Sequence, residues 1–203
     1  AGKTSLKNLI KDLLQNFGKT YSSPRSFNNY LGVPVSLSNL SLEDKYGVFE
    51  VGMSKTGEIR KLNKLIKPHI GVITNIGEAH IENFKSTKGI ALAKSEIIED
   101  IIKGGTIILN RDDKYFNYLF EKAKIHKLKI FTFGKHTKSN VRLKKIKKIG
   151  ALSHVFVYIN NQPIDFKIKD LNIYNVLSSL AVLIELKFDF EKVKNKFKVY
   201  DSP

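Results

Sequence analysis

Ala1-Gly2-Lys3-Thr4 opens the chain and matches the end of a phosphate-binding loop of the form G-x-x-x-x-G-K-[ST]. In such a loop, backbone N–H groups bind phosphate oxygens, the lysine reaches the β and γ phosphates, and the hydroxyl binds magnesium. Apolar residues then recur at helical spacing, at Leu6, Leu9, Ile10, Leu13, Leu14 and Phe17. The loop therefore leads into a helix N-terminus, which favours an anion. Three matching residues also occur by chance, so a fortuitous match stays open at this point.

Length and composition narrow the class of protein. At 203 residues the chain suits one domain with a substantial core, and it contains no cysteine, which excludes disulfides and thiolate metal sites. Apolar runs stay well short of the roughly 20 residues that span a bilayer, and no signal peptide is visible. We expect a cytoplasmic protein without membrane insertion, and a fragment that begins inside its phosphate loop.

The net charge of +16, from 35 Lys and Arg against 19 Asp and Glu, raises the question of a nucleic-acid partner. Arginine is the residue favoured for bidentate phosphate and base contacts, yet lysine supplies nearly all of this charge. The lysines are scattered, apart from a cluster over residues 144–148. We therefore expect a solvated lysine-rich surface and no nucleic-acid partner.

Periodicity predicts an α/β fold. Near-continuous apolar runs that read as buried strands alternate with amphipathic segments that read as helices. The strands are expected at 46–51, 70–75, 106–109 and 129–133, and the helices at 58–66, 87–102 and 114–126. The period changes over residues 141–169, where Val155, Val157 and Ile159 alternate with their neighbours, and this predicts an antiparallel hairpin, followed by helices at 172–186 and 189–197. The predicted fold is a mostly parallel, P-loop-type sheet flanked by helices, with this antiparallel region near the C-terminus.

Polar residues recur where the predicted parallel strands end. They are Glu50, Asn75 with His80, and Asn110 with Asp112 and Asp113. In open α/β sheets ligands bind at the carboxyl edge of the strands, and the phosphate loop opens onto the same edge. These groups are therefore expected to converge on one site.

Lys94 breaks the pattern of the helix predicted over residues 87–102. At 100° per residue the apolar face of that helix consists of Ile90, Ile97, Ile98 and Ile101, and Lys94 lies in its middle. A lysine in that position must extend to solvent, pair with an acid, or be chemically modified.

Two adjacent asparagines, Asn28 and Asn29, precede the sequence Tyr-Leu-Gly-Val-Pro34. They are consistent with simple turn chemistry, and equally with amides presented to a polar substrate. Position alone does not decide between these readings.

Together these segments resemble the central ATP-binding domain of the Mur ligases, the ATP-dependent amide ligases of peptidoglycan synthesis. Motifs in the order and spacing of that family are Gly2-Lys3-Thr4, Glu50-Val-Gly52, Gly57-Glu58-Ile59, Thr74-Asn75-Ile-Gly-Glu-Ala-His80, Ala93-Lys94-Ser-Glu96-Ile97, Asn110 with Asp112-Asp113, and Asn172-Ile-Tyr-Asn175. The Phe27-Asn28-Asn29-Tyr-Leu-Gly-Val-Pro34 segment is similar to the branch that adds D-alanyl-D-alanine. The resemblance covers most of the chain.

The resemblance implies a role for each matching residue. Lys3, His80 and Lys94 would be catalytic, with Lys3 on the β and γ phosphates and Lys94 carbamylated to position metal. Thr4 and Glu50 would bind a first magnesium ion, and His80 a second. The residues expected to contact ATP are Gly2, Lys3, Thr4, Asn75, Asn110, Asp113 and Asn172. Asn28 and Asn29 would lie on the side of the UDP-muramoyl-peptide substrate.

The implied activity is ADP-forming ligation of D-alanyl-D-alanine to UDP-N-acetylmuramoyl-tripeptide through an acyl phosphate, with ATP and Mg²⁺. Residues 1–203 would be the central domain only, without the UDP-substrate domain and the C-terminal ligase domain, and so inactive alone; we also expect a monomer. Leu171 departs from the family, which usually has histidine before Asn172. Another Mur-type ligase, a folylpolyglutamate synthetase-like enzyme, and a non-catalytic nucleotide-binding protein remain alternatives, with a nucleic-acid-binding module the last choice.

Overall fold

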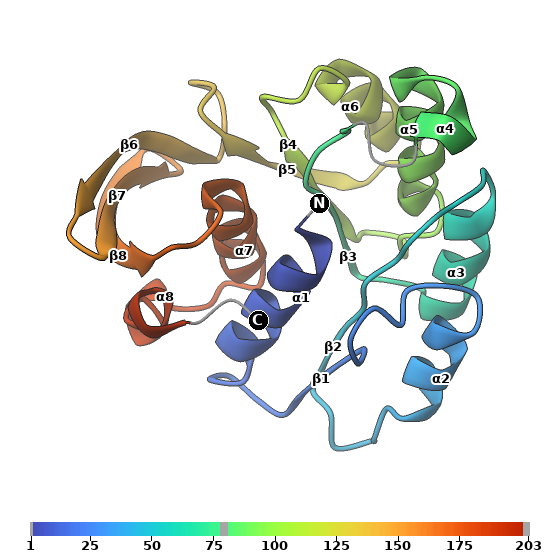
Figure 1. Ribbon diagram of the computed structural model, residues 1–203, viewed down its shortest axis with the longest axis horizontal. Coiled ribbons are helices and arrows are strands. Elements are labelled where there is room, and N and C mark those ends of the chain that lie inside the picture. Colours follow the sequence, from blue (N-terminus) through green and yellow to red (C-terminus); the bar gives the residue numbers. More distant parts are fainter. Residues whose placement is uncertain (1, 78–80, 201–203) are drawn as a thin grey trace.

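The protein is described here by a computed structural model, which describes residues 2–77 and 81–200 (Figure 1). A six-stranded sheet in the order β3-β4-β5-β6-β7-β8 forms its centre, and its first four strands are parallel. The parallel strands are β3 (Ile70–Ile73), β4 (Thr106–Asn110), β5 (Lys129–Gly134) and β6 (Val141–Ile149). The predicted fold class is confirmed.

Strand β4 is buried on both faces, which explains its continuous apolar sequence. Ile108 packs in one cluster with α1 and α7, whereas Ile107 and Leu109 pack in another with α6. Helices therefore cover both faces of the sheet. The helices nearest to it are α1 (Lys3–Leu14) and α7 (Ile173–Glu185) on one face, and α6 (Phe116–Ile125) with the 3₁₀ turn η1 (Ser95–Ile98) on the other.

A separate two-stranded parallel sheet lies beside β3 and consists of β1 (Thr20–Ser22) and β2 (Tyr46–Val48). Helices α2 (Gly32–Ser38) and α3 (Glu58–Ile66) lie on this side of the molecule in Figure 1, whereas α5 (Thr87–Lys94) lies beside the short α4 (Ile81–Phe84) that precedes it. The Gly-Val-Pro sequence expected as a turn is the start of α2. Pro34 fits there because the first helical turn needs no N–H donor at that position.

The antiparallel region has three strands rather than the expected hairpin. Strands β7 (Leu152–Ile159) and β8 (Gln162–Lys169) form that hairpin, and the lysine-rich β6 adds to β7 through the turn at Gly150. A bulge between Leu143 and Lys145 bends β6. The sequence of β6 hides this strand because most of it is exposed on both faces.

The last predicted helix differs from expectation. The helix expected at 189–197 is split into η2 (Phe190–Lys192) and α8 (Lys196–Val199), because Phe190 and Phe197 both turn inward to pack on Phe166 of β8. Within the described residues, no helix combines the length and apolar character needed to cross a bilayer.

The helix expected at 87–102 is also shorter, since α5 ends at Lys94 and continues only as η1 to Ile98. Glu96 of η1 is buried, and its carboxylate accepts hydrogen bonds from the backbone N–H groups of Gly57 and Arg60. It thus satisfies free donors at the start of α3. This tertiary contact is what tightens the chain after Lys94.

Glu99 joins α3 to α6, since its carboxylate contacts Arg60 and lies 2.6 Å from the ammonium of Lys122. These two cations, Arg60 first, lower the pKa of Glu99 to about 2. A lowered carboxylate pKa means that the stabilisation is present above the ordinary value of 4.5 and is lost as the pH falls through about 2.

We expect Glu99→Gln to lower the free energy of unfolding at pH 7 by about 1–2 kcal/mol, with allowance for solvent screening. In urea titrations, its difference from the wild type should shrink below pH 4.5 and vanish near pH 2. Glu121→Gln removes an exposed ion pair with Lys124 and serves as control, with an expected effect below about 0.5 kcal/mol. A pH-independent effect of Glu99→Gln would contradict this account.

Candidate nucleotide-binding site

The N-terminus of α1 is built to approach an anion closely. Gly2 precedes α1 with a φ of 84°, in the left-handed region that favours glycine. Asn175 of α7 donates from Nδ2 to the Gly2 carbonyl at 3.1 Å, and a Cβ on Gly2 would lie 3.3 Å from the same nitrogen. No side chain among the described residues caps α1, so its first N–H groups remain available to a ligand.

Thr4 and Glu50 meet at this end of α1, as the sequence predicted. Glu50 follows β2, is 6% exposed, and accepts a hydrogen bond at Oε2 from the Thr4 hydroxyl at 2.7 Å. Its other oxygen, Oε1, accepts from Nδ2 of Asn28 at 2.7 Å. Asn28 therefore lies against a predicted metal ligand.

This pair of oxygen donors fits magnesium. Mg²⁺ is usually held by one or two carboxylates together with substrate phosphates and water. Within the described part of the chain, no group of three or more His, Asp or Glu side chains gathers to form a complete protein cage for a metal. A Thr hydroxyl beside a single buried carboxylate, at a helix N-terminus, suits an ion that arrives with a nucleotide. His80, predicted to serve a second ion, lies outside the described residues.

Lys94 reaches the same edge of the sheet from the end of α5. Its ammonium donates to the backbone carbonyl of Asn75 at 2.7 Å. Burial first, and then the positive charge of Lys3, lower the pKa of Lys94 to about 8, although the carboxylate of Asp113 acts in the opposite direction. Lys3 and Lys94 thus bring two cationic side chains to one point, although they come from distant parts of the sequence.

Asn110 and Asp113, at the end of β4, hold the segment that carries Asn75. Asn110 donates from Nδ2 to the carbonyl of Thr74 at 3.0 Å, and Asp113 accepts at Oδ2 from the N–H of Ile76 at 2.6 Å. Their side chains therefore fix the backbone on both sides of Asn75. A contact of either residue with adenosine stays a prediction.

Asn172 caps α7, because its Oδ1 accepts from the N–H groups of Tyr174 and Asn175. Asn29 plays a similar part at α2, where its Oδ1 accepts from the N–H groups of Leu31 and Gly32. Each residue thus already has a local structural role. A contact of Asn172 with ATP, and of Asn29 with the peptide substrate, stays a prediction.

Sequence reasoning assigned no role to three side chains that organise the site, namely Lys7, Asp112 and Asn175. Asp112 accepts from the Tyr174 hydroxyl and from two backbone N–H groups after β5, so it ties three elements together. Asp112 was among the polar residues expected at this edge, and Asn175 belongs to a motif shared with the family, whereas Lys7 was not singled out although it falls on the same side of α1 as Ile10 and Leu14. Leu171, the departure from the family, packs against the main core.

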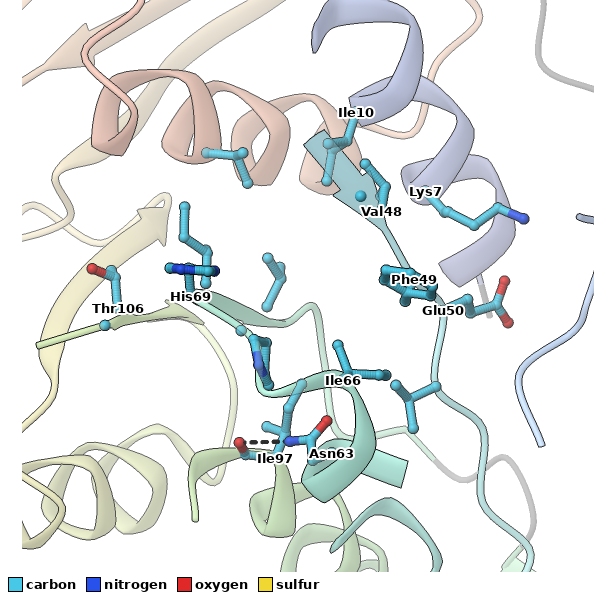
Figure 2. Close-up of a pocket in the computed structure, with 18 of the residues that line it drawn as sticks. Lys7, Ile10, Val48, Phe49, Glu50, Asn63, Ile66, His69, Ile97 and Thr106 are labelled. Atoms are coloured by element: carbon cyan, nitrogen blue, oxygen red, sulfur yellow. Dashed lines mark hydrogen bonds between the residues drawn. The ribbon is translucent and has the colours of Figure 1, made fainter. Parts of the chain in front are cut away.

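A cavity of about 810 Å³ lies beside this site, between β2 and β3 (Figure 2). Residues of both strands line it, together with apolar residues of α1 and α3. At the carboxyl ends of the strands, the lining changes to Lys3, Glu50 and Lys94. Figure 2 shows Lys7 and Glu50 extending in the same direction from α1 and from the end of β2.

Comparison with known proteins assigns this arrangement to a family. A sequence profile described as the Mur ligase middle domain matches residues 1–183. The chain belongs to the Mur ligase family. The resemblance seen in the sequence is therefore confirmed.

Two Mur ligases named UDP-N-acetylmuramoyl-tripeptide–D-alanyl-D-alanine ligase are similar to this chain. The one from Rickettsia prowazekii is 38% identical over 168 residues, which cover 82% of this chain and 37% of the relative. The one from Buchnera aphidicola is 34% identical over 196 residues, which cover 95% of this chain and 43% of the relative. The chain thus spans about two fifths of their length.

A crystal structure of MurF from Acinetobacter baumannii superposes with a TM-score of 0.93 at 27% identity, over 100% of this chain and 45% of that one. The predicted fold agrees with this structure. The family branch expected from the Asn28-Asn29 segment agrees with the names of these relatives.

We expect Lys94 to titrate near pH 8 because it is buried and faces Lys3. Competitive acetylation of the chain as a function of pH, read by mass spectrometry, would measure this value, with the exposed Lys124 as reference. Lys3→Met should raise the pKa of Lys94, and Asp113→Asn should lower it. A Lys94 pKa at the ordinary value of 10.5 that neither substitution changes would contradict the proposed geometry.

Proposed function

We propose that residues 1–203 are the central ATP-binding domain of an ADP-forming ligase that joins D-alanyl-D-alanine to UDP-N-acetylmuramoyl-tripeptide. The observation that carries this proposal is the 2.7 Å contact between the Thr4 hydroxyl and the Glu50 carboxylate, at a helix N-terminus that Lys3 and Lys94 also reach. The names of the two relatives, which are D-alanyl-D-alanine ligases, support the choice of substrates. ATP and a UDP-linked precursor as substrates favour a cytoplasmic enzyme, and we expect a monomer.

The residues present divide the work of phosphoryl transfer. The first N–H groups of α1 and the Lys3 ammonium bind the phosphates, and Thr4 with Glu50 would hold magnesium. Magnesium, when bound, neutralises charge on the transferring phosphoryl group. Asn75, Asn110, Asp113 and Asn172 would lie on the nucleotide side.

In the proposed reaction the tripeptide carboxylate attacks the γ-phosphorus, and the bond from that phosphorus to the ADP oxygen breaks. The amine of D-alanyl-D-alanine then attacks the acyl carbon of the resulting acyl phosphate. Phosphate leaves, and the nitrogen loses a proton to give the amide. Asn28 and Asn29 remain candidates for the substrate side, and no serine or cysteine nucleophile is needed.

We also propose that Lys94 is carbamylated. A neutral amine adds to CO₂ with loss of a proton, and this turns a buried cation into an anion. The lowered pKa of about 8 supports this because it increases the neutral fraction at physiological pH. A ¹³C-bicarbonate NMR signal that disappears in Lys94→Arg would support the modification, whereas an identical spectrum from the variant would refute it.

The cavity between β2 and β3 supports the proposal that the chain begins inside its phosphate loop. Among the residues that the structure describes, β2 pairs only with β1 and β3 only with β4, which leaves one edge of each strand unpaired, and both strands line this cavity. An extended segment ahead of Ala1 would pair with both edges and bury the apolar lining. In phosphate-loop proteins, a strand leads directly into the loop.

We expect an N-terminal extension of the chain by the residues that precede Ala1 in its gene to raise thermal stability by roughly 10 °C or more, since it fills an apolar cavity. A matched extension with proline at alternate positions, which removes ladder donors, should give little of this gain. Equal stability with and without the native extension would argue against a strand in this cavity.

The activity is tested with the full-length protein encoded by the source gene. Phosphate release from ATP should require UDP-muramoyl-tripeptide and D-alanyl-D-alanine together. Release with a different acid and amine would favour another Mur-type ligase or a folylpolyglutamate synthetase-like enzyme. ATP binding without release under any of these conditions would indicate a non-catalytic nucleotide-binding protein.

In the same assay, Glu50→Gln should lower the rate by about 10²-fold or more, because it removes the charge expected to hold magnesium. Glu43→Gln changes an exposed carboxylate that pairs with Lys19 and should leave the rate unchanged. Full activity of Glu50→Gln would refute the assignment of Glu50.

A further inference from the structure

Lys7 is a buried lysine to which the proposed reaction assigns no role. It lies on α1 one turn after Lys3 and is only 4% exposed. Its ammonium donates to the carbonyl of Ser23 at 2.5 Å and to that of Arg25 at 2.6 Å. No carboxylate among the described residues forms an ion pair with it, so its hydrogen bonds go to backbone carbonyls.

This arrangement is costly if Lys7 serves packing alone. Removing an ammonium group from water is unfavourable, and burial lowers the pKa of Lys7. Apolar side chains of similar volume usually replace buried charges without loss of stability. The two donated hydrogen bonds therefore indicate that the backbone at Ser23 and Arg25 must be held in a defined position.

The backbone that Lys7 holds belongs to the Ser23–Asn29 loop, which runs from the end of β1 towards α2. Arg25 has a φ of 42°, a left-handed conformation that is unfavourable for a residue with a side chain. Phe27 N–H then donates to Pro24 O, and Asn28 N–H to Ser26 O, which makes two successive tight turns. These turns project Asn28 back towards Glu50.

The loop is attached to Glu50 at several points. Asn28 donates from Nδ2 to Oε1 of Glu50 at 2.7 Å, and its carbonyl accepts from Gly52 N–H at 2.7 Å. The hydroxyl of Ser23 accepts from Glu50 N–H at 3.3 Å. A Cβ on Gly52 would lie 2.9 Å from Oδ1 of Asn28, so the amide packs tightly against the strand end.

These contacts form a closed circuit. Thr4 of α1 donates to Oε2 of Glu50, and Asn28 of the loop donates to Oε1. Lys7 closes the circuit, because it lies on α1 and donates to the carbonyl of Ser23 in the same loop. The orientation of the Glu50 carboxylate therefore depends on a lysine that does not touch it.

We propose that Lys7 is a positioning residue for the divalent cation. By holding the Ser23–Asn29 loop on α1, it sets Asn28 against one oxygen of Glu50 and so orients the carboxylate beside the Thr4 hydroxyl. This inference rests on the proposed function, because it assumes that Thr4 and Glu50 bind Mg²⁺ with a nucleotide.

The test is a Mg²⁺ titration of fluorescent mant-ADP binding to the full-length protein. Partners that orient a metal ligand typically contribute 10–100-fold to metal affinity, so Lys7→Met should weaken apparent Mg²⁺ affinity at least tenfold. Lys11→Met makes the same substitution one turn further along α1, where the side chain forms no hydrogen bond with the described residues, and should leave the affinity unchanged. Mg²⁺ affinity unaltered in a folded Lys7→Met protein would overturn the proposal.

A double-mutant cycle separates positioning from a general loss of stability. If Lys7 acts through Asn28, then Asn28→Ala should weaken Mg²⁺ affinity by a similar factor, and the double variant should be little worse than either single one. Independent, multiplying effects would overturn the proposal. If Lys7→Met does not fold, Asn28→Ala alone decides. An Asn28→Ala protein with the Mg²⁺ affinity of the wild type would show that Asn28 does not orient Glu50, and would overturn the proposal.

The two proposals fail in different ways. A wild-type protein that binds no nucleotide with Mg²⁺ refutes the proposed function and, with it, the role of Lys7. A wild-type protein with Mg²⁺-dependent binding that Lys7→Met and Asn28→Ala leave unchanged refutes only the role of Lys7.

Discussion

The carboxylate of Glu50 is the point on which the site depends. It is buried at the end of β2, and each of its oxygens accepts a hydrogen bond from a different element, Thr4 of α1 and Asn28 of the Ser23–Asn29 loop. A buried carboxylate is tolerated only when its oxygens are satisfied in this way. The contact therefore fixes α1 against β2, and with it the direction of the helix N-terminus that faces the nucleotide.

Charge is distributed in accordance with that constraint. Lys3 and Lys94 come close enough for their like charges to interact, while Asp113 partly offsets them. Such a group of cations is unfavourable in an empty site and favourable once a polyphosphate lies between them. These groups lie together because Glu50 follows β2 of the small sheet, while Asn75 and Asp113 follow β3 and β4 of the six-stranded sheet, and ligands usually bind at the carboxyl ends of strands in α/β sheets.

Much of this could be predicted from sequence. Continuous apolar runs such as β4 identify strands buried on both faces, and the position of Lys94 in an apolar helix face singled out a side chain whose ammonium reaches the Asn75 carbonyl. The break after Lys94 could not be predicted, because it depends on Glu96 capping a helix that lies nearly forty residues earlier. Strand β6 could not be predicted as a separate strand for a related reason. Its exposed lysines carry no alternating pattern, and only pairing with β7 makes it a strand.

The unpaired edges of β2 and β3 have a consequence for handling the isolated chain. A row of free N–H and C=O groups is a template for any extended peptide, and native proteins usually cover or interrupt such edges. Here both strands line an apolar gap that would accept a strand from a neighbouring molecule. Self-association in concentrated solutions of the 203-residue chain would then arise when an extended segment of one molecule inserts into this gap of another. The high net positive charge would oppose it.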